Sequence, residues 1–141
     1  MIDTAPAKPV HRARVLVADD DAAVRSLLSD ALTGAGYRVD VVSNGMELLE
    51  RLGILDDRPV WWPEFDVVVT DVRMPGLTGT EVLEGVAMMG GRPRVILITS
   101  FVDKAAREAA QRYGAAGLLE KPVPLNTLLD AIEAALEGAF P

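Results

Sequence analysis

The sequence contains no cysteine and a single histidine, His11, among its 141 residues. The absence of cysteine excludes disulfide bonds and metal sites built from thiolates. His11 lies in the amino-terminal segment, away from every motif described below, and no role follows for it. Functions that depend on thiol chemistry are therefore excluded.

Positive charge and long apolar runs are also scarce. Fourteen Lys and Arg against 21 Asp and Glu give a net charge of −7, whereas phosphate contacts need a basic face, so we expect no direct nucleic-acid binding. Apolar runs reach about five residues, far below the roughly 20 of a membrane span, and we expect no membrane insertion. Residues 1–13 have no apolar stretch that resembles a secretory signal. These features favour a cytoplasmic protein.

The chain length is typical of one domain, and half of the residues are apolar, enough for a core. The predicted division is a flexible amino-terminal arm at 1–13, a domain at 14–138 and a tail at 139–141. Residues 53–64 predict a loop longer than the usual span of about two to six residues. This loop contains Trp61 and Trp62, which we expect to form a flap over the sheet edge or a helix. A partner-docking patch is the alternative.

Short apolar segments suggest strands. Val67, Val68 and Val69 are consecutive, a pattern typical of a strand buried on both faces of a parallel sheet. The predicted strands are 14–18, 37–42, 65–70, 94–99 and 115–120. Pro75, Gly76 and Gly79 predict a loop after the third of them.

Helical periodicity fills the intervals between these strands. Asp21 is a cap for a first helix that ends at Gly34, with an apolar face made of Val24, Leu27, Leu28, Ala31 and Leu32. Asn44 and Glu47 begin a second helix at 46–52, and Thr78 and Glu81 form a capping box for a third. Met88 and Met89 at the end of the third helix are expected to fill the core. The last two helices are predicted at 103–113 and 125–137. Strands and helices that alternate in this way predict an α/β fold, a parallel sheet with helices on both faces.

Polar side chains follow four of the predicted strands. They are Asp19 and Asp20, Asp71, Thr99 and Ser100, and Lys121. The carboxyl ends of parallel strands lie on one edge of the sheet, where α/β proteins bind ligands. Carboxylates brought together there repel one another, and Mg²⁺ with oxygen ligands would supply the counter-charge. A carboxylate can also act as a nucleophile toward phosphorus. The acids at 19–21 could instead be helix caps, although one cap accounts for only one of them.

At these positions the chain resembles the receiver domain of two-component response regulators, from Arg14 to Leu136. The matching motifs are Val-Ala-Asp-Asp ending at Asp20, Thr-Asp-Val-Arg-Met-Pro-Gly around Asp71, Ile-Thr-Ser around Thr99 and Glu-Lys-Pro around Lys121. The resemblance implies a flavodoxin-like, doubly wound sheet with strand order 2-1-3-4-5.

The resemblance also implies a role for each matching residue. Asp71 would be the phosphoacceptor. Mg²⁺, or Mn²⁺ in its place, would be bound by Asp19, Asp20, Asp71 and the main-chain carbonyl of Arg73. Thr99, Ser100 and Lys121 would bind the phosphoryl group, with Thr99 as the switch hydroxyl. The peptide bond between Lys121 and Pro122 would be cis.

Three positions bear on how such a domain would behave. Leu118 stands where receivers often carry an aromatic residue coupled to the switch threonine, so we expect output to depend on Thr99 and loop shifts alone. Arg73 and Phe101 occupy positions that tune the lifetime of the phosphorylated state in the family. We hypothesise that these two side chains limit the access of water and lengthen that lifetime.

The sequence therefore predicts a signalling module and not an enzyme. By the resemblance, a histidine kinase or phosphotransfer protein would phosphorylate Asp71, and a downstream effector would respond, as in the family, at the face made by 103–113, 115–120 and 125–137. A homodimer would use the same face. One alternative is an aspartyl phosphohydrolase, which usually has a second acid where this chain has Arg73. The other is a degenerate receiver that only binds proteins, a hypothesis that the intact acids, Thr99 and Lys121 disfavour.

Overall fold

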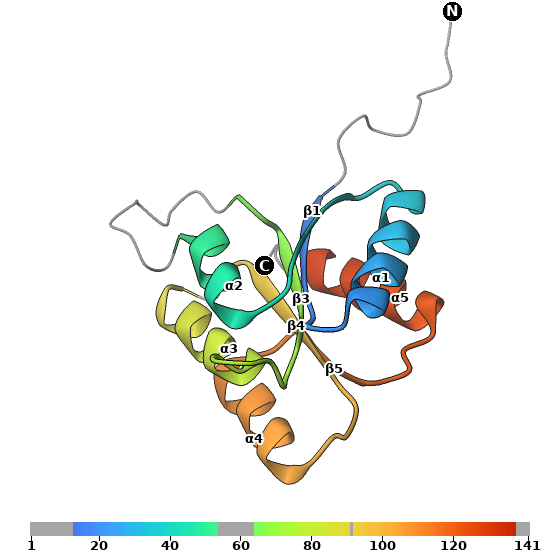
Figure 1. Ribbon diagram of the computed structural model, residues 1–141. Helices are drawn as coiled ribbons and strands as arrows, with labels where there is room; N and C mark the ends of the chain where they lie inside the picture. The colour runs from blue at the N-terminus through green and yellow to red at the C-terminus, as the bar shows by residue number, and fades with distance from the viewer. Residues whose placement is uncertain (1–12, 54–63, 91, 138–141) are drawn as a thin grey trace, which may run out of the picture.

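The computed structural model describes residues 13–53, 64–90 and 92–137. One parallel sheet has the order β2-β1-β3-β4-β5. Its strands are β1 (Arg14–Ala18), β2 (Arg38–Val42), β3 (Val67–Asp71), β4 (Arg94–Thr99) and β5 (Gly117–Glu120). The helices are α1 (Ala22–Gly34), α2 (Gly45–Leu52), α3 (Gly79–Met88), α4 (Lys104–Tyr113) and α5 (Leu125–Glu137) (Figure 1). The predicted fold and strand order are confirmed. The arm up to residue 12, the tail and residues 54–63, including Trp61 and Trp62, lie outside the described residues.

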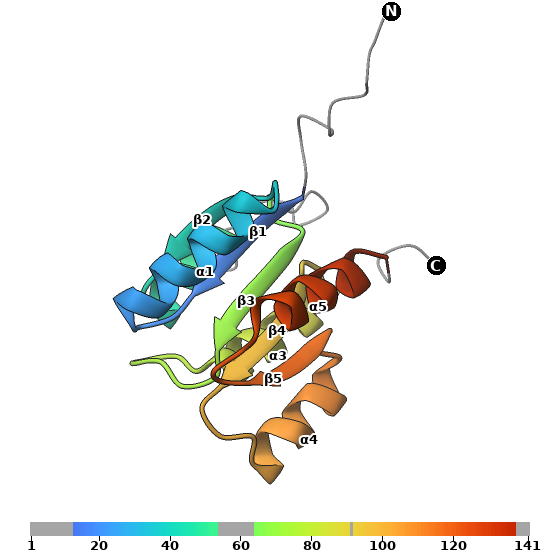
Figure 2. The same ribbon diagram turned by 90° about the vertical axis from the view of Figure 1, so that its right-hand side faces the viewer.

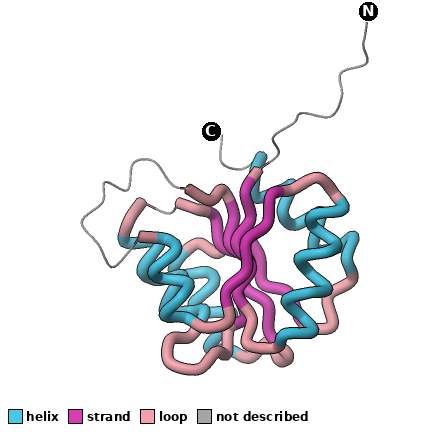
Figure 3. Tube along the Cα trace, turned by 45° about the horizontal axis from the view of Figure 1, so that its top comes forward, coloured by secondary structure: helices cyan, strands magenta, loops and turns pink. Residues whose placement is uncertain are grey.

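The sheet separates two apolar layers. Successive strand side chains point to opposite faces, so Val67 and Val69 pack with residues of α1 and α5, whereas Val68 packs with residues of α2, α3 and α4. Figure 3 shows helices on both sides of the sheet, and Figure 2 views it from the side of α1 and α5. All three valines are fully buried, as their run predicts for a central strand. This packing fixes the end of β3 in the middle of the sheet edge.

Side-chain caps determine where the helices begin. The Asp21 carboxylate accepts the N–H groups of Ala23 and Val24 at the start of α1, as predicted. Thr78 and Glu81 form the predicted capping box of α3. At α2, Asn44 accepts the Glu47 N–H at 2.9 Å. The Glu47 carboxylate instead accepts the N–H and hydroxyl of Ser43, which lowers the pKa of Glu47.

Gly79 allows α3 to begin directly against the end of β3. Its N–H donates to the carbonyl of Val72 at 2.8 Å. A Cβ atom on Gly79 would lie only 2.4 Å from the carbonyl oxygen of Asp71. Gly79 is therefore the first residue of α3, as the predicted Thr78 cap implies, and its missing side chain permits the close approach.

Two apolar side chains expected in the core are exposed. Met88 is 82% exposed at the end of α3, and Leu27 is 59% exposed on α1. The expectation of core filling was therefore wrong for Met88, and the buried stripe of α1 is narrower than its apolar face. None of the helices within the described ranges has the length and hydrophobicity that a membrane span requires.

Candidate functional site

Three carboxylates meet at the carboxyl edge of the sheet. Asp19 directly follows β1, Asp20 comes next, and Asp71 ends β3. One carboxylate oxygen of each lies within 4.8 Å of those of the other two. Asp19 and Asp71 are buried, whereas Asp20 is exposed. The cluster therefore joins two acids inside the fold to a third that faces solvent.

Lys121 extends from the end of β5 into this cluster. Its Nζ donates to Asp71 Oδ2 at 2.9 Å and lies 2.7 Å from Asp19 Oδ2. The contact with Asp19 is an ion pair without hydrogen-bond geometry, so Asp19 Oδ2 is buried without a hydrogen-bond partner. The peptide bond that follows, Lys121–Pro122, is cis. Three acids and an ammonium that are distant in sequence thus share one site.

Burial and charge act in opposite directions on this cluster. Burial raises the pKa of Asp71, and hydrogen bonds from Lys121 and from the Arg73 N–H only partly offset this. Burial alone would lower the pKa of Lys121, but its contacts with Asp19 and Asp71 outweigh burial and raise that pKa. The ammonium is therefore held charged, whereas the Asp71 carboxylate is a stronger base than an exposed aspartate.

Local hydrogen bonds orient the acids. The Arg73 N–H donates to Asp71 Oδ1 at 3.1 Å, and the Asp21 N–H donates to Asp19 Oδ1 at 2.9 Å. Arg25 of α1 donates from Nη1 to the main-chain carbonyl of Asp19 at 2.7 Å. We did not predict this role of Arg25, and the only signal in the sequence is its position one helical turn after Asp21.

Thr99 ends β4 and has no exposed surface. Its Oγ1 accepts the Phe101 N–H at 3.3 Å and donates to the Phe101 carbonyl at 3.2 Å. The hydroxyl is thus bound within its own turn. The main-chain N–H of Lys121 donates to the Thr99 carbonyl at 2.7 Å, which places the two residues side by side. The side chains of Ser100 and Phe101 in the same turn are exposed.

The other two positions singled out in the sequence point elsewhere. The Arg73 side chain turns toward the beginning of α4, where Nη2 lies 3.2 Å from Asp103 Oδ2. Leu118 of β5 is half-buried and packs against the apolar layer that also contains Leu97 and Tyr113. The sequence carried no indication of the contact between Arg73 and Asp103.

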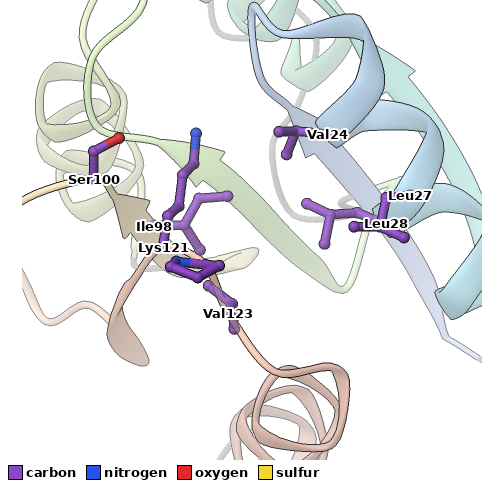
Figure 4. Close-up of a pocket in the computed structure, with 8 residues that line it drawn as sticks. Val24, Leu27, Leu28, Ile98, Ser100, Lys121 and Val123 are labelled. Atoms are coloured by element: carbon purple, nitrogen blue, oxygen red, sulfur yellow. The ribbon is translucent and has the colours of Figure 1, made fainter.

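An apolar pocket of about 370 Å³ adjoins the cluster. Figure 4 shows Val24, Leu27 and Leu28 of α1 on one side, with Lys121 and Val123 on the other. Ile98, Ser100 and Pro122 complete its lining. The exposed Leu27 therefore contributes to the wall of a pocket beside the charged site. We did not predict this pocket.

The donor set suits a divalent metal ion. Three carboxylates lie close together, and the single positive charge of Lys121 contacts the two buried ones. Oxygen ligands of this type favour hard ions such as Mg²⁺. The acidic cluster is consistent with the divalent-metal site that is typical of receiver domains.

Comparison with known proteins gives the same assignment. The response regulator receiver domain family matches residues 15–133. The chain is 38% identical over 124 residues to the C4-dicarboxylate transport transcriptional regulatory protein DctD of Pseudomonas aeruginosa, and 37% identical over 128 residues to the response regulator MprA of Mycolicibacterium vanbaalenii. These alignments cover 88% and 91% of this chain but 25% and 52% of the two relatives. The chain thus spans between a quarter and about half of their length.

Solved structures agree with the sequence relatives. The chemotaxis response regulator CheY4 of Vibrio cholerae superposes with a TM-score of 0.73 at 30% identity, over 88% of this chain and 98% of that chain. The fold, the acidic cluster and the sequence match all point in one direction. The chain belongs to the response regulator receiver domain family of two-component signalling, whose members are signalling phosphoacceptors and not catalytic enzymes.

Proposed function

We propose that this chain is a phosphorylation-operated signalling module in which Asp71 accepts the phosphoryl group. The main support is the contact of 2.9 Å between Asp71 Oδ2 and Lys121 Nζ, inside a cluster completed by Asp19 and Asp20. Receiver domains interact with histidine kinases, so the donor would be a phosphohistidine on a kinase or phosphotransfer protein.

In the proposed transfer, a carboxylate oxygen of Asp71 attacks phosphorus and forms an acyl phosphate. The bond between phosphorus and the donor imidazole nitrogen breaks, and its electron pair stays on that nitrogen. The Lys121 ammonium would offset negative charge on the transferring oxygens. The Arg73 N–H holds Asp71 Oδ1 and so restricts rotation of the carboxylate.

Asp19, Asp20, Asp71 and the main-chain carbonyl of Arg73 would hold Mg²⁺, or Mn²⁺ in its place. The bound ion would supply positive charge to the carboxylates and to the phosphoryl oxygens. Lys121 contacts both buried acids of this set.

Transfer would change the hydrogen bonds around Asp71. The Thr99 hydroxyl, now bound to the backbone of Phe101, would exchange this partner for a phosphoryl oxygen. Ser100 and Lys121 would contact the same group. The turn between β4 and α4 would move with Thr99, and the surface of α4, β5 and α5 would carry the change to an effector or to a second copy. Because Leu118 is not aromatic, this output would depend on Thr99 and its turn.

Acetyl phosphate with Mg²⁺ tests the proposal. We expect the intact mass to rise by one phosphoryl group in the wild type and in the control Asp30→Asn, which alters an exposed acid of α1. Asp71→Asn should not be labelled. Labelling that persists in Asp71→Asn, or multiple turnover of a small phosphate ester, would contradict the proposal.

A further inference from the structure

Arg73 has its backbone at the acidic cluster and its charge elsewhere. Its N–H donates to Asp71 Oδ1 at 3.1 Å, so the base of the side chain lies beside the three carboxylates. The guanidinium nevertheless turns away and pairs with Asp103 Oδ2 at 3.2 Å. The guanidinium therefore binds Asp103 in preference to the carboxylates of the cluster.

Asp103 is an anchor fixed by the helix that it caps. Its Oδ1 accepts the Ala106 N–H at 2.8 Å, and its main-chain carbonyl accepts the Arg107 N–H at 3.1 Å. These bonds fix the carboxylate at the amino terminus of α4. Its second oxygen, Oδ2, is left to bind Arg73.

A released guanidinium would have a second attractive position close by. Three carboxylates lie within 4.8 Å of one another, and Lys121 contacts two of them. A second cation there would occupy oxygens that a divalent metal ion needs, because both would compete for the same ligands.

From these contacts we propose that Asp103 is a positioning residue that holds the Arg73 guanidinium at α4 and so keeps the acidic cluster open to a divalent cation. This inference rests on the metal-dependent function proposed above. The Arg73 side chain is 66% exposed and that of Asp103 is 35% exposed. Exposed pairs of this kind are weak, so their loss should change metal affinity by about two- to fivefold and not by orders of magnitude.

Calorimetric titration of Mg²⁺ into the whole chain tests the inference through a double-mutant cycle. Asp103→Asn removes the charge but keeps an oxygen for the cap, since asparagine caps helices as well as aspartate does. We expect Asp103→Asn to weaken Mg²⁺ binding by about two- to fivefold. The same change should have little effect when Arg73→Met is already present, because the competing cation is gone.

The matched control is Glu108→Gln, which removes one negative charge from the same helix at a residue paired with Lys104. We expect it to leave Mg²⁺ affinity nearly unchanged. If Asp103→Asn unfolds, Asp103→Ser is the second test, because the serine hydroxyl can also cap the helix. It should weaken Mg²⁺ binding to the same extent. Thermal unfolding without Mg²⁺ reports separately on the cap.

The outcomes separate the two proposals. An equal loss of affinity on Asp103→Asn with and without Arg73 would overturn the positioning role, as would no loss at all. Failure of the wild type to bind Mg²⁺ would instead contradict the metal-dependent function. Coupling between Arg73 and Asp103, together with an unaffected Glu108→Gln, is the result that supports the inference.

Discussion

At the scale of single residues, burial makes the ionised form of the Asp71 carboxyl group less favourable than it is in water. Burial raises its pKa, and the contact with Lys121 lowers it by less. A carboxyl group whose pKa is raised on folding stabilises the fold below its ordinary pKa of 3.8 and loses that contribution as pH rises through the folded pKa. At neutral pH the ionised carboxylate therefore destabilises the folded domain. For Lys121, the contacts with the two acids outweigh burial, so its charged form stabilises the fold. This stabilisation is present below its ordinary pKa of 10.5 and is lost only as pH rises through its raised folded pKa.

Asp71→Asn should accordingly make the domain more stable at pH 7, by about 1 kcal/mol. The amide oxygen can still accept from Lys121, and the desolvated charge is removed. Urea unfolding at several pH values measures this, and the gain should shrink as pH falls toward the folded pKa of Asp71. A variant that is less stable than wild type at neutral pH would refute the argument.

Phe101→Ala and Arg73→Ala should each shorten the life of the phosphorylated state several-fold if these side chains exclude water from Asp71. Phe101 is 63% exposed in the turn after Thr99, so it can cover the site only from outside. Intact mass, measured over time after the donor is removed, shows the loss of the phosphoryl group and gives the rate of dephosphorylation. Met88→Ala, which alters an exposed side chain at the far end of α3, is the control. Unchanged rates in both variants would remove the hypothesis.

At the scale of elements, the contact between β3 and α3 controls the backbone at Asp71. A methyl group at position 79 would overlap the Asp71 carbonyl oxygen at 2.4 Å, so one of the two elements would have to move.

Gly79→Ala should therefore destabilise the domain by about 1–3 kcal/mol, and it should slow the labelling of Asp71 by acetyl phosphate. The matched control is Gly34→Ala at the end of α1, where an added methyl group would meet no atom within 4 Å apart from its chain neighbours and the backbone of its own helix turn. Because alanine favours helix, this control should be neutral or slightly stabilising. Chemical denaturation compares the two, and equal stabilities would contradict the role of Gly79.

The arrangement of the elements also shows which features of the fold and the site the sequence could predict. The run Val67–Val69 identified a buried strand because only a sheet covered on both sides buries both faces of a strand. Strand order came from the family resemblance, since periodicity does not determine which strands are neighbours. Met88 and Leu27 were expected in the core because an apolar stripe does not reveal whether another element covers it. Arg73 and Asp103, 30 residues apart in two different loops, had no local pattern that would pair them.

At the scale of the whole molecule, a ligand that binds only the folded state stabilises the entire domain. Mg²⁺ at 100 times its dissociation constant should add about 2.7 kcal/mol to the free energy of unfolding. Thermal unfolding with Mg²⁺ and after chelation measures this difference. Asp20→Asn should reduce the stabilisation by Mg²⁺, because it removes one carboxylate of the cluster. Asp30→Asn, which changes an exposed acid outside the cluster, should retain it. An identical response in both variants would exclude Asp20 as a ligand.

Lys121 is fastened at both of its ends. Its main-chain N–H donates to the carbonyl of Thr99, and its ammonium contacts the carboxylates of Asp19 and Asp71. Phosphorylation of Asp71 would move one contact of the ammonium from the carboxylate to a phosphoryl oxygen, while the hydrogen bond from the Lys121 N–H to Thr99 stays in place. β5, at one edge of the sheet, is thereby connected to β3 at its centre through the side chain of Lys121.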